Sequence, residues 1–236
     1  ILATNTPEVL NETVADTIMG LMLSTARRMP ELDQMVKSGQ WTSNIGEKSF
    51  GLDVHHKVLG IIGMGGIGSA VSKRARFGFD MNILYHNRSR NEDAEQKYGA
   101  TYCSLEDLLK QSDFVCLMTP LTPQTEKMMG EKEFKLMKES AIFINCSRGK
   151  TVDEEALIDA LKTGEIHAAG LDVFVQEPIQ EDNPLLSMKN VVTLPHIGSA
   201  TYETRLKMAM LAATNLVAGL QGETPPTLIK AAVKVK

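Results

Sequence analysis

The sequence predicts an α/β fold of the Rossmann type, built on a doubly wound parallel sheet. From Lys57 onward, short apolar runs alternate with amphipathic helical stretches, which is typical of βαβ units. Right-handed crossovers between such units make the sheet parallel. A glycine-rich turn, Gly63–Gly68, joins the first apolar run to the first of these helices, as at the start of a Rossmann-type unit.

Six apolar runs are expected as strands: Val58–Ile62, Asn82–Tyr85, Phe114–Met118, Ala141–Asn145, His167–Leu171 and Val191–Leu194. The helices expected between them are Ile67–Phe77, Glu92–Tyr98, Leu105–Lys110, Glu131–Met137 and Glu154–Lys162. Ser104 and Asp107 form a capping-box signal for the third of these helices. A first helix is expected over Glu8–Met29, where Pro30 interrupts it, and a last one over Ala200–Leu220.

Composition excludes several classes of function. The 236 residues carry a net charge of −4 and no basic block, so there is no reason to expect nucleic acid or an anionic membrane as partner. No apolar stretch approaches the roughly 20 residues of a membrane span. The three cysteines show no C-x-x-C spacing, which favours a reducing cytoplasm. No metal is expected, because the adjacent His55 and His56 would point apart on a strand.

The pattern G-x-G-x-x-G over Gly63–Gly68 is weak alone and becomes specific through its context, after an apolar strand and before a helix. Gly63 permits the tight turn, Gly65 lets the backbone approach a pyrophosphate, and Gly68 lets the helix pack on the strand. The free N–H groups of the helix N-terminus then favour phosphate. The sequence therefore predicts a nicotinamide dinucleotide site.

The turn after the second strand reads Asn87-Arg88-Ser89-Arg90. NAD-specific domains usually place an acid there for the ribose 2′-hydroxyl. Two arginines and a serine suit a 2′-phosphate instead, so NADP is the preferred cofactor and NAD a possible one. The alternative is that these are solvated loop charges.

Residues suited to catalysis follow the other strands, and the carboxyl ends of parallel strands lie at the same edge of the sheet. Arg148 suits a substrate carboxylate, and His196 can protonate a developing alkoxide. Glu177 would orient that imidazole, as the carboxylate of a catalytic triad does. Taken singly, each has an ordinary structural explanation; together they predict reduction of a 2-oxo acid. Cys146 lacks a base partner and is not proposed as a nucleophile.

At these residues the sequence resembles the D-2-hydroxyacid dehydrogenase family, in particular its glyoxylate/hydroxypyruvate and 2-ketogluconate reductase branch. The motifs that carry the resemblance are Asn5-Thr6-Pro7, Val14-Ala15-Asp16, Gly39-Gln40-Trp41, the glycine loop, Asn145–Gly149, Gly170–Phe174, Glu177-Pro178 and Leu194–Thr201. The resemblance implies reduction of glyoxylate, hydroxypyruvate or 2-ketogluconate to the D-2-hydroxy acid, with Arg148, Glu177 and His196 as catalytic residues. The motifs and the resemblance together predict a set of cofactor-binding residues at these loops. They are Gly63, Gly65, Gly66, Ile67, Gly68, Asn87, Arg88, Ser89, Arg90, Thr119, Pro120, Cys146, Ser147, Asp172 and Ser199.

The resemblance also implies a homodimer formed through the cofactor domains, and an N-terminal substrate domain that is missing here. Residues 1–205 are expected to be the dinucleotide-binding domain, with a helix and dimerisation arm over 1–50 and the sheet over 57–200. Residues 206–236 would return to the absent domain as a remnant with nothing to pack against. We therefore expect the chain alone to bind cofactor weakly and to turn over little.

Two alternatives stay open. One is a dinucleotide-binding regulator on the same fold, or an inactive fragment. The other is a sugar-acid or formate-specific dehydrogenase, with the same chemistry and another substrate. Fold analogy does not separate these functions.

Overall fold

The computed structural model describes residues 2–229 and contains a sheet of seven parallel strands. The strands are β1 (Val58–Ile62), β2 (Asn82–His86), β3 (Thr101–Tyr102), β4 (Phe114–Leu117), β5 (Ile142–Asn145), β6 (Ala168–Leu171) and β7 (Val191–Thr193). Their order is β3-β2-β1-β4-β5-β6-β7. Strands β1 to β3 therefore extend from the centre of the sheet to one edge, and strands β4 to β7 extend from the centre to the other edge. This is the doubly wound arrangement that the sequence predicts.

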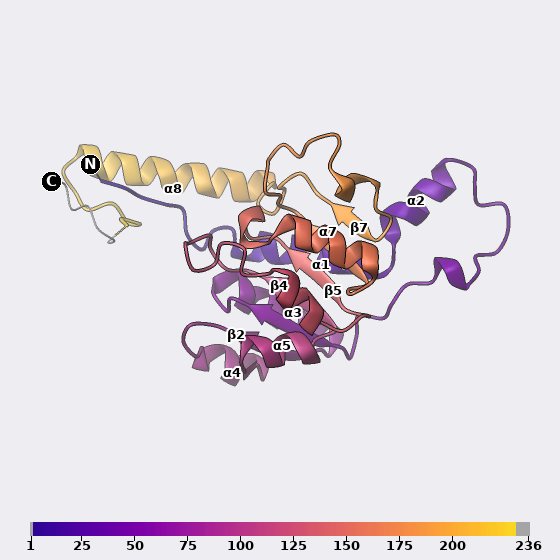
Figure 1. The fold of residues 1–236 in the computed structure, drawn as a ribbon. Coiled ribbons are helices and arrows are strands. Elements are labelled where there is room, and N and C mark those ends of the chain that lie inside the picture. The colour runs from indigo at the N-terminus through magenta and orange to yellow at the C-terminus, as the bar shows by residue number, and fades with distance from the viewer. Residues whose placement is uncertain (1, 230–236) are drawn as a thin grey trace.

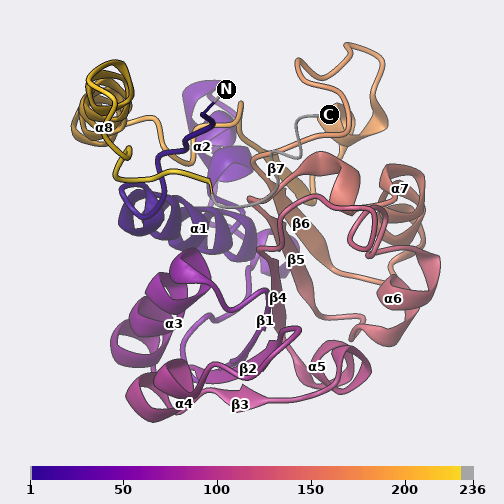
Figure 2. The ribbon, with the colours of Figure 1, turned by 90° about the vertical axis from the view of Figure 1, so that its left-hand side faces the viewer.

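Helices cover both faces of the sheet (Figure 2). The helices are α1 (Asn11–Ala26), α2 (Met29–Lys37), α3 (Gly66–Phe79), α4 (Glu92–Tyr98), α5 (Leu105–Gln111), α6 (Glu131–Leu136), α7 (Glu154–Thr163) and α8 (Tyr202–Leu220). Short 3₁₀ turns lie at Glu47–Ser49, Gly149–Thr151 and Pro184–Ser187. Helices α1, α3 and α4 lie on one face, and α5, α6 and α7 lie on the other.

The central strands β4, β5 and β6 are buried along their whole length, as expected for a sheet packed on both faces. One apolar cluster fills the α1/α3 face, around Ile18, Met22 and Val71. A second fills the α5/α6/α7 face, around Phe134 and Phe143. The sheet is therefore held rigidly, and the loops at its carboxyl edge are mounted on a fixed frame.

The predicted first helix is wrong in its extent. The chain turns at Arg27-Arg28, where Arg28 adopts a left-handed φ of 54°, and a second helix starts at Met29. Pro30 lies in the first turn of that helix instead of ending the first one. Proline is well suited there, because the N–H groups of a first turn have no partner within the helix.

The prediction for His55 and His56 is also wrong. The two residues lie in a turn before β1, and their Nδ1 atoms are 2.7 Å apart with the rings edge to face. The left-handed φ of His56, 61°, brings the rings together. Across residues 2–229 no group of three or more His, Cys, Asp or Glu side chains is arranged to hold a metal.

Two segments extend away from the sheet in opposite directions (Figure 1). On one side lie α2 and the loop that carries Trp41, whose side chain is 59% exposed. On the other side lies α8, whose apolar residues Leu206, Met210 and Leu220 are exposed. None of the helices between residues 2 and 229 is long and apolar enough to cross a membrane.

The tail after α8 does find a partner, contrary to expectation. Thr4 and Leu228 form an antiparallel bridge, and Ile229 N–H donates to the Ala3 carbonyl at 2.9 Å. Thr227 also hydrogen-bonds to both ends of the Asn215 carboxamide. The tail is therefore anchored on the N-terminal segment and on α8 itself.

Candidate cofactor and substrate site

The carboxyl ends of six strands lie in one row. The residues paired along this row are Ile62, His86, Leu117, Asn145, Leu171 and Thr193. Each loop that the sequence analysis singled out begins within a few residues of this row, so the predicted side chains are gathered along one edge of the sheet.

The glycine loop after β1 fits a dinucleotide. Gly63 has a φ of +105°, which side chains rarely adopt, and a Cβ on Gly68 would lie 2.6 Å from the Gly63 carbonyl oxygen. These two glycines are required by the turn and by the packing of α3. A Cβ on Gly65 would meet no atom within 4 Å. Gly65 thus leaves open space beside the N-terminus of α3, where a phosphate would be favoured.

Glu95 on α4 holds the basic turn that follows β2, residues Asn87–Arg90, through hydrogen bonds. Arg90 donates to both carboxylate oxygens of Glu95, at 3.0 and 2.6 Å. The buried Tyr85 hydroxyl donates to the same carboxylate at 2.5 Å and accepts the Asn91 N–H at 2.7 Å. The hydrogen bonds from Arg90 and Tyr85 hold the pKa of Glu95 below its usual value.

The two arginines of this turn are therefore not equivalent. Arg88 and Ser89 are exposed and make no side-chain hydrogen bond to any residue from 2 to 229, whereas one edge of Arg90 is occupied by Glu95. Asn91 ties the turn to the glycine loop, since its Nδ2 donates to the Met64 carbonyl at 3.0 Å. The sequence does not predict a role for Glu95 or Asn91. Asn91 could have been found as the N-cap of α4, where it accepts the Ala94 N–H.

His196 and Glu177 form the pair that the sequence predicts. The His196 Nδ1 lies 2.7 Å from Glu177 Oε2, and the other carboxylate oxygen accepts the Phe174 N–H at 3.0 Å. Partial burial alone would raise the pKa of Glu177. The hydrogen bonds from His196 and Phe174 and the charges of His196 and Arg148 nevertheless hold that pKa below its usual value. His196 has a left-handed φ of 54°, a conformation uncommon for residues other than glycine and one that clusters at functional sites.

Asp172 holds the chain that follows His196. The side chain is 1% exposed, and its two oxygens accept the N–H groups of Ile197 at 2.7 Å and Gly198 at 2.8 Å. Burial raises the pKa of Asp172 above its usual value, although these two hydrogen bonds act in the opposite direction. Both oxygens of this carboxylate are therefore used to hold the loop Pro195–Ser199, which we call the histidine loop.

Arg148 is placed by the close approach of two loops. A Cβ on Gly149 would overlap the Phe174 carbonyl group, so the loop after β5 lies directly against the chain leading to Glu177. The Arg148 side chain is exposed, and its Nη1 donates to the Ser147 carbonyl at 2.6 Å. Its guanidinium remains available to an anion, close enough for its charge to lower the pKa of Glu177.

The remaining predicted residues lie at the same edge with different degrees of access. Ser147 is buried, and its hydroxyl donates to Asn145 Oδ1 at 2.8 Å, so this side chain is turned into the fold. Cys146 is buried as well, and burial raises the pKa of its thiol well above the usual value. Thr119 and Pro120 follow β4, and Ser199 follows the histidine loop and is partly exposed.

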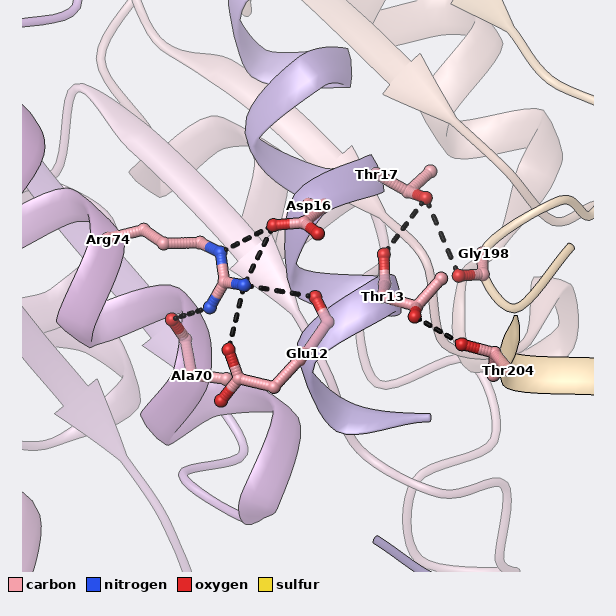
Figure 3. A network of polar contacts seen from close by, with 8 residues as sticks. All are labelled: Glu12, Thr13, Asp16, Thr17, Ala70, Arg74, Gly198 and Thr204. Carbon is pink, nitrogen blue, oxygen red and sulfur yellow. Dashed lines mark hydrogen bonds and ion pairs between the residues drawn. The ribbon is translucent and has the colours of Figure 1, made fainter. Parts of the chain in front are cut away.

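Helix α1 connects the glycine-loop helix to the histidine loop (Figure 3). On one side Arg74 of α3 forms ion pairs with Glu12 at 2.8 Å and Asp16 at 2.7 Å. On the other side the hydroxyls of Thr13 and Thr204 lie 2.5 Å apart at the start of α8. The first turns of α1 thus fix α3, the helix that follows the glycine loop, relative to the segment that follows His196.

The fold and this edge together define a dinucleotide-binding domain of the Rossmann type, with an arginine and a carboxylate–imidazole pair at the same sheet edge as the glycine loop. Residues 19–198 match the family model described as the NAD-binding domain of D-isomer specific 2-hydroxyacid dehydrogenases. The chain belongs to this family.

Known relatives agree with the assignment. The chain is 60% identical over 223 residues to glyoxylate/hydroxypyruvate reductase B of Escherichia coli, covering 94% of this chain and 69% of the relative. A crystal structure from Thermus thermophilus, of the protein TT0316, superposes with a TM-score of 0.91 at 42% identity, over 97% of this chain and 71% of that one. The NADPH-dependent glyoxylate/hydroxypyruvate reductase of Sinorhizobium meliloti, solved with NADP and malonate, gives 0.89 at 36% identity, over 98% and 70%.

Proposed function

We propose that this chain carries the cofactor site and the catalytic residues of an NADPH-dependent reductase. Its substrate would be a 2-oxo acid such as glyoxylate, hydroxypyruvate or 2-ketogluconate, and its product the D-2-hydroxy acid. The observation that carries the proposal is the 2.7 Å contact between His196 and Glu177 at the same sheet edge as the glycine loop. The names of the Escherichia coli and Sinorhizobium meliloti relatives support this substrate class.

Three side chains would each have a separate role in substrate binding and reduction. Arg148 would bind the carboxylate and polarise the neighbouring carbonyl, because a guanidinium offers paired donors in one plane. His196 would donate a proton to the developing alkoxide. Glu177 would orient the imidazole. When bound, a reduced nicotinamide supplies the hydride.

The cofactor would lie across the glycine loop, with its pyrophosphate at the N-terminus of α3. Arg88 and Ser89 are exposed and make no side-chain hydrogen bond to residues 2–229, and we assign the 2′-phosphate of NADPH chiefly to them. Arg90 would contribute less, because Glu95 neutralises its charge at close range. The Sinorhizobium meliloti relative, which was solved with NADP, supports this cofactor preference.

We further propose a homodimer in the cytoplasm. The arm formed by α2 and the Trp41 loop extends from the sheet and exposes Val36, Trp41 and Ile45, which suits contact with a second copy. We keep residues 1–205 as the cofactor domain, with α8 as a connection to a substrate domain. The exposed apolar residues of α8 are consistent with a surface that such a domain covers.

The test is a cofactor-oxidation assay against a panel of 2-oxo acids. We expect NADPH oxidation with glyoxylate and hydroxypyruvate, and faster turnover in a fusion that joins the chain to a substrate domain. NADH should serve less well. Absence of turnover with every 2-oxo acid in that fusion would contradict the proposal.

A further inference from the structure

A shallow hollow of about 420 Å³ opens beside the glycine loop. Its lining residues are Pro7, Glu8, Leu10, Asn11 and Gly66. Two helix N-termini meet there, because Asn11 is the first residue of α1 and Gly66 is the first residue of α3. The hollow therefore adjoins the place where a pyrophosphate is expected.

The carboxamide of Asn11 lies directly against Gly66. A Cβ on Gly66 would collide with the Asn11 Nδ2 and would lie 3.0 Å from its Cγ and 3.2 Å from its Oδ1. Glycine is needed at this position for the approach of Asn11 as well as for the approach of a ligand. The Asn11 amide group is thus held within reach of anything bound at the start of α3.

This carboxamide makes no side-chain hydrogen bond to any residue from 2 to 229, although the side chain is half-buried. A carboxamide has two N–H donors and one acceptor to satisfy. Among the other lining residues, Pro7 and Leu10 have apolar side chains, and the exposed Glu8 carboxylate would repel an anion. Asn11 is the side chain that can donate to a phosphate in this hollow.

The position of Asn11 is fixed in advance by the clamp between α1 and α3. Arg74 binds Glu12 and Asp16, which lie one and five residues after Asn11 on α1 (Figure 3). Arg74 also donates to the Glu12 carbonyl of α1, and a bond to the Ala70 carbonyl of its own helix holds the guanidinium in place. Because the backbone of Asn11 is held in this way, only its side chain has to be ordered when it binds.

We propose that Asn11 is a further cofactor ligand, donating from Nδ2 to a pyrophosphate oxygen beside the backbone N–H groups of α3. The proposal deepens the proposed function, since it rests on the chain binding a nicotinamide dinucleotide. The pyrophosphate is common to NADPH and NADH, so Asn11 strengthens the binding of both to the same extent. In this respect it differs from Arg88, which acts on the 2′-phosphate alone.

The experiment is calorimetric titration of the 236-residue chain with NADPH and, separately, with NADH. Loss of one hydrogen bond to a charged group predicts that Asn11→Ala raises both dissociation constants about tenfold. Asn11→Asp places a negative charge beside the phosphate and should raise both about 100-fold. Asn11→Ser keeps a donor and should fall between the parent and Asn11→Ala. Gln111→Ala, which removes an exposed carboxamide at the end of α5, is the matched control and should leave both constants unchanged.

Unchanged dissociation constants in Asn11→Ala and Asn11→Asp would overturn the proposal. A loss confined to NADPH would also overturn it, because the contact would then lie at the 2′-phosphate. An equal loss for both cofactors supports Asn11 even if the parent shows no preference for NADPH, in which case only the proposed cofactor preference fails. Unfolding of one variant is detected by circular dichroism, and the serine variant then decides the question.

Discussion

The imidazole Nδ1 of His196 lies 2.7 Å from the Oε2 of Glu177, and Phe174 N–H binds the other carboxylate oxygen. The carboxylate is therefore held from two sides, and it holds the imidazole in turn. No side chain or backbone group of residues 2–229 hydrogen-bonds to the Nε2 atom of His196, so under the proposed function this is the nitrogen that would exchange a proton with a substrate.

Glu177→Gln should lower kcat roughly 10- to 100-fold, because the amide does not fix the imidazole as well as the carboxylate does. The KM for NADPH should stay within about a factor of two. Glu154→Gln is the matched control, since Glu154 accepts the Val175 N–H nearby without touching His196. Equal kinetics in Glu177→Gln and the parent would contradict the role of Glu177.

Glu177→Gln also tests how the stability of the fold depends on pH. The pKa of Glu177 is held below its ordinary value of 4.5, so the ionised carboxylate stabilises the fold above that pH. This contribution is lost as the pH falls through the lowered pKa of the folded state. Thermal unfolding from pH 7 to pH 3 should show the parent more stable than Glu177→Gln at neutral pH, with a difference that shrinks below about pH 4.5. A difference that grows toward acid would reverse the assignment.

Asp172→Asn should lower kcat about tenfold or more while leaving a cooperative unfolding transition. The amide keeps one acceptor oxygen, so either Ile197 or Gly198 loses its partner and the histidine loop shifts. Steady-state kinetics with saturating NADPH would measure the change. A normal kcat would show that the two hydrogen bonds do not position His196.

Much of the fold follows from patterns local to each element. The strands and the inner helices are predicted to within one or two residues, because burial on both sheet faces leaves apolar runs of the right length. The edge strand β3 was missed, since Thr101–Tyr102 is only two residues long and both are exposed. The turn at Arg28 was missed because proline near the start of a helix looks the same in sequence as proline that ends one.

The site was predictable where parallel strands bring their loops to one edge. That rule placed Arg148, Glu177 and His196 together without any contact being known. It does not say which partner each side chain chooses. Asp172 binds two N–H groups 25 and 26 residues away, a choice that depends on packing between elements. Glu95 binds Arg90 only five residues away, but the sequence does not show that these two side chains meet.

The two arginines of the basic turn should behave differently on substitution. Arg88→Ala should lower the ratio of kcat/KM for NADPH to that for NADH by roughly 10- to 100-fold, as expected for one lost charge-assisted hydrogen bond. Arg90→Ala should lower it by about threefold at most, because Glu95 already engages that side chain. Equal losses in the two variants would show that Arg90 shares the phosphate equally.

Gly149→Ala should destabilise the fold by about 2–3 kcal/mol or more, because the new methyl group would overlap the Phe174 carbonyl and neither backbone can move freely. Gly20→Ala is the control. A Cβ there meets nothing within 4 Å, and alanine in the interior of α1 should be neutral or stabilising by about 0.5–1 kcal/mol. Urea unfolding measures both; a neutral Gly149→Ala would show that the loops are not in close contact.

We propose His196 as the proton donor of a 2-oxo acid reductase. The most direct measurement is kcat for hydroxypyruvate reduction by His196→Ala at saturating NADPH, in a fusion that joins the chain to a substrate domain. We predict a fall of about 10²- to 10⁴-fold with little change in the KM for NADPH. A kcat equal to that of the parent would contradict the role of His196 as proton donor.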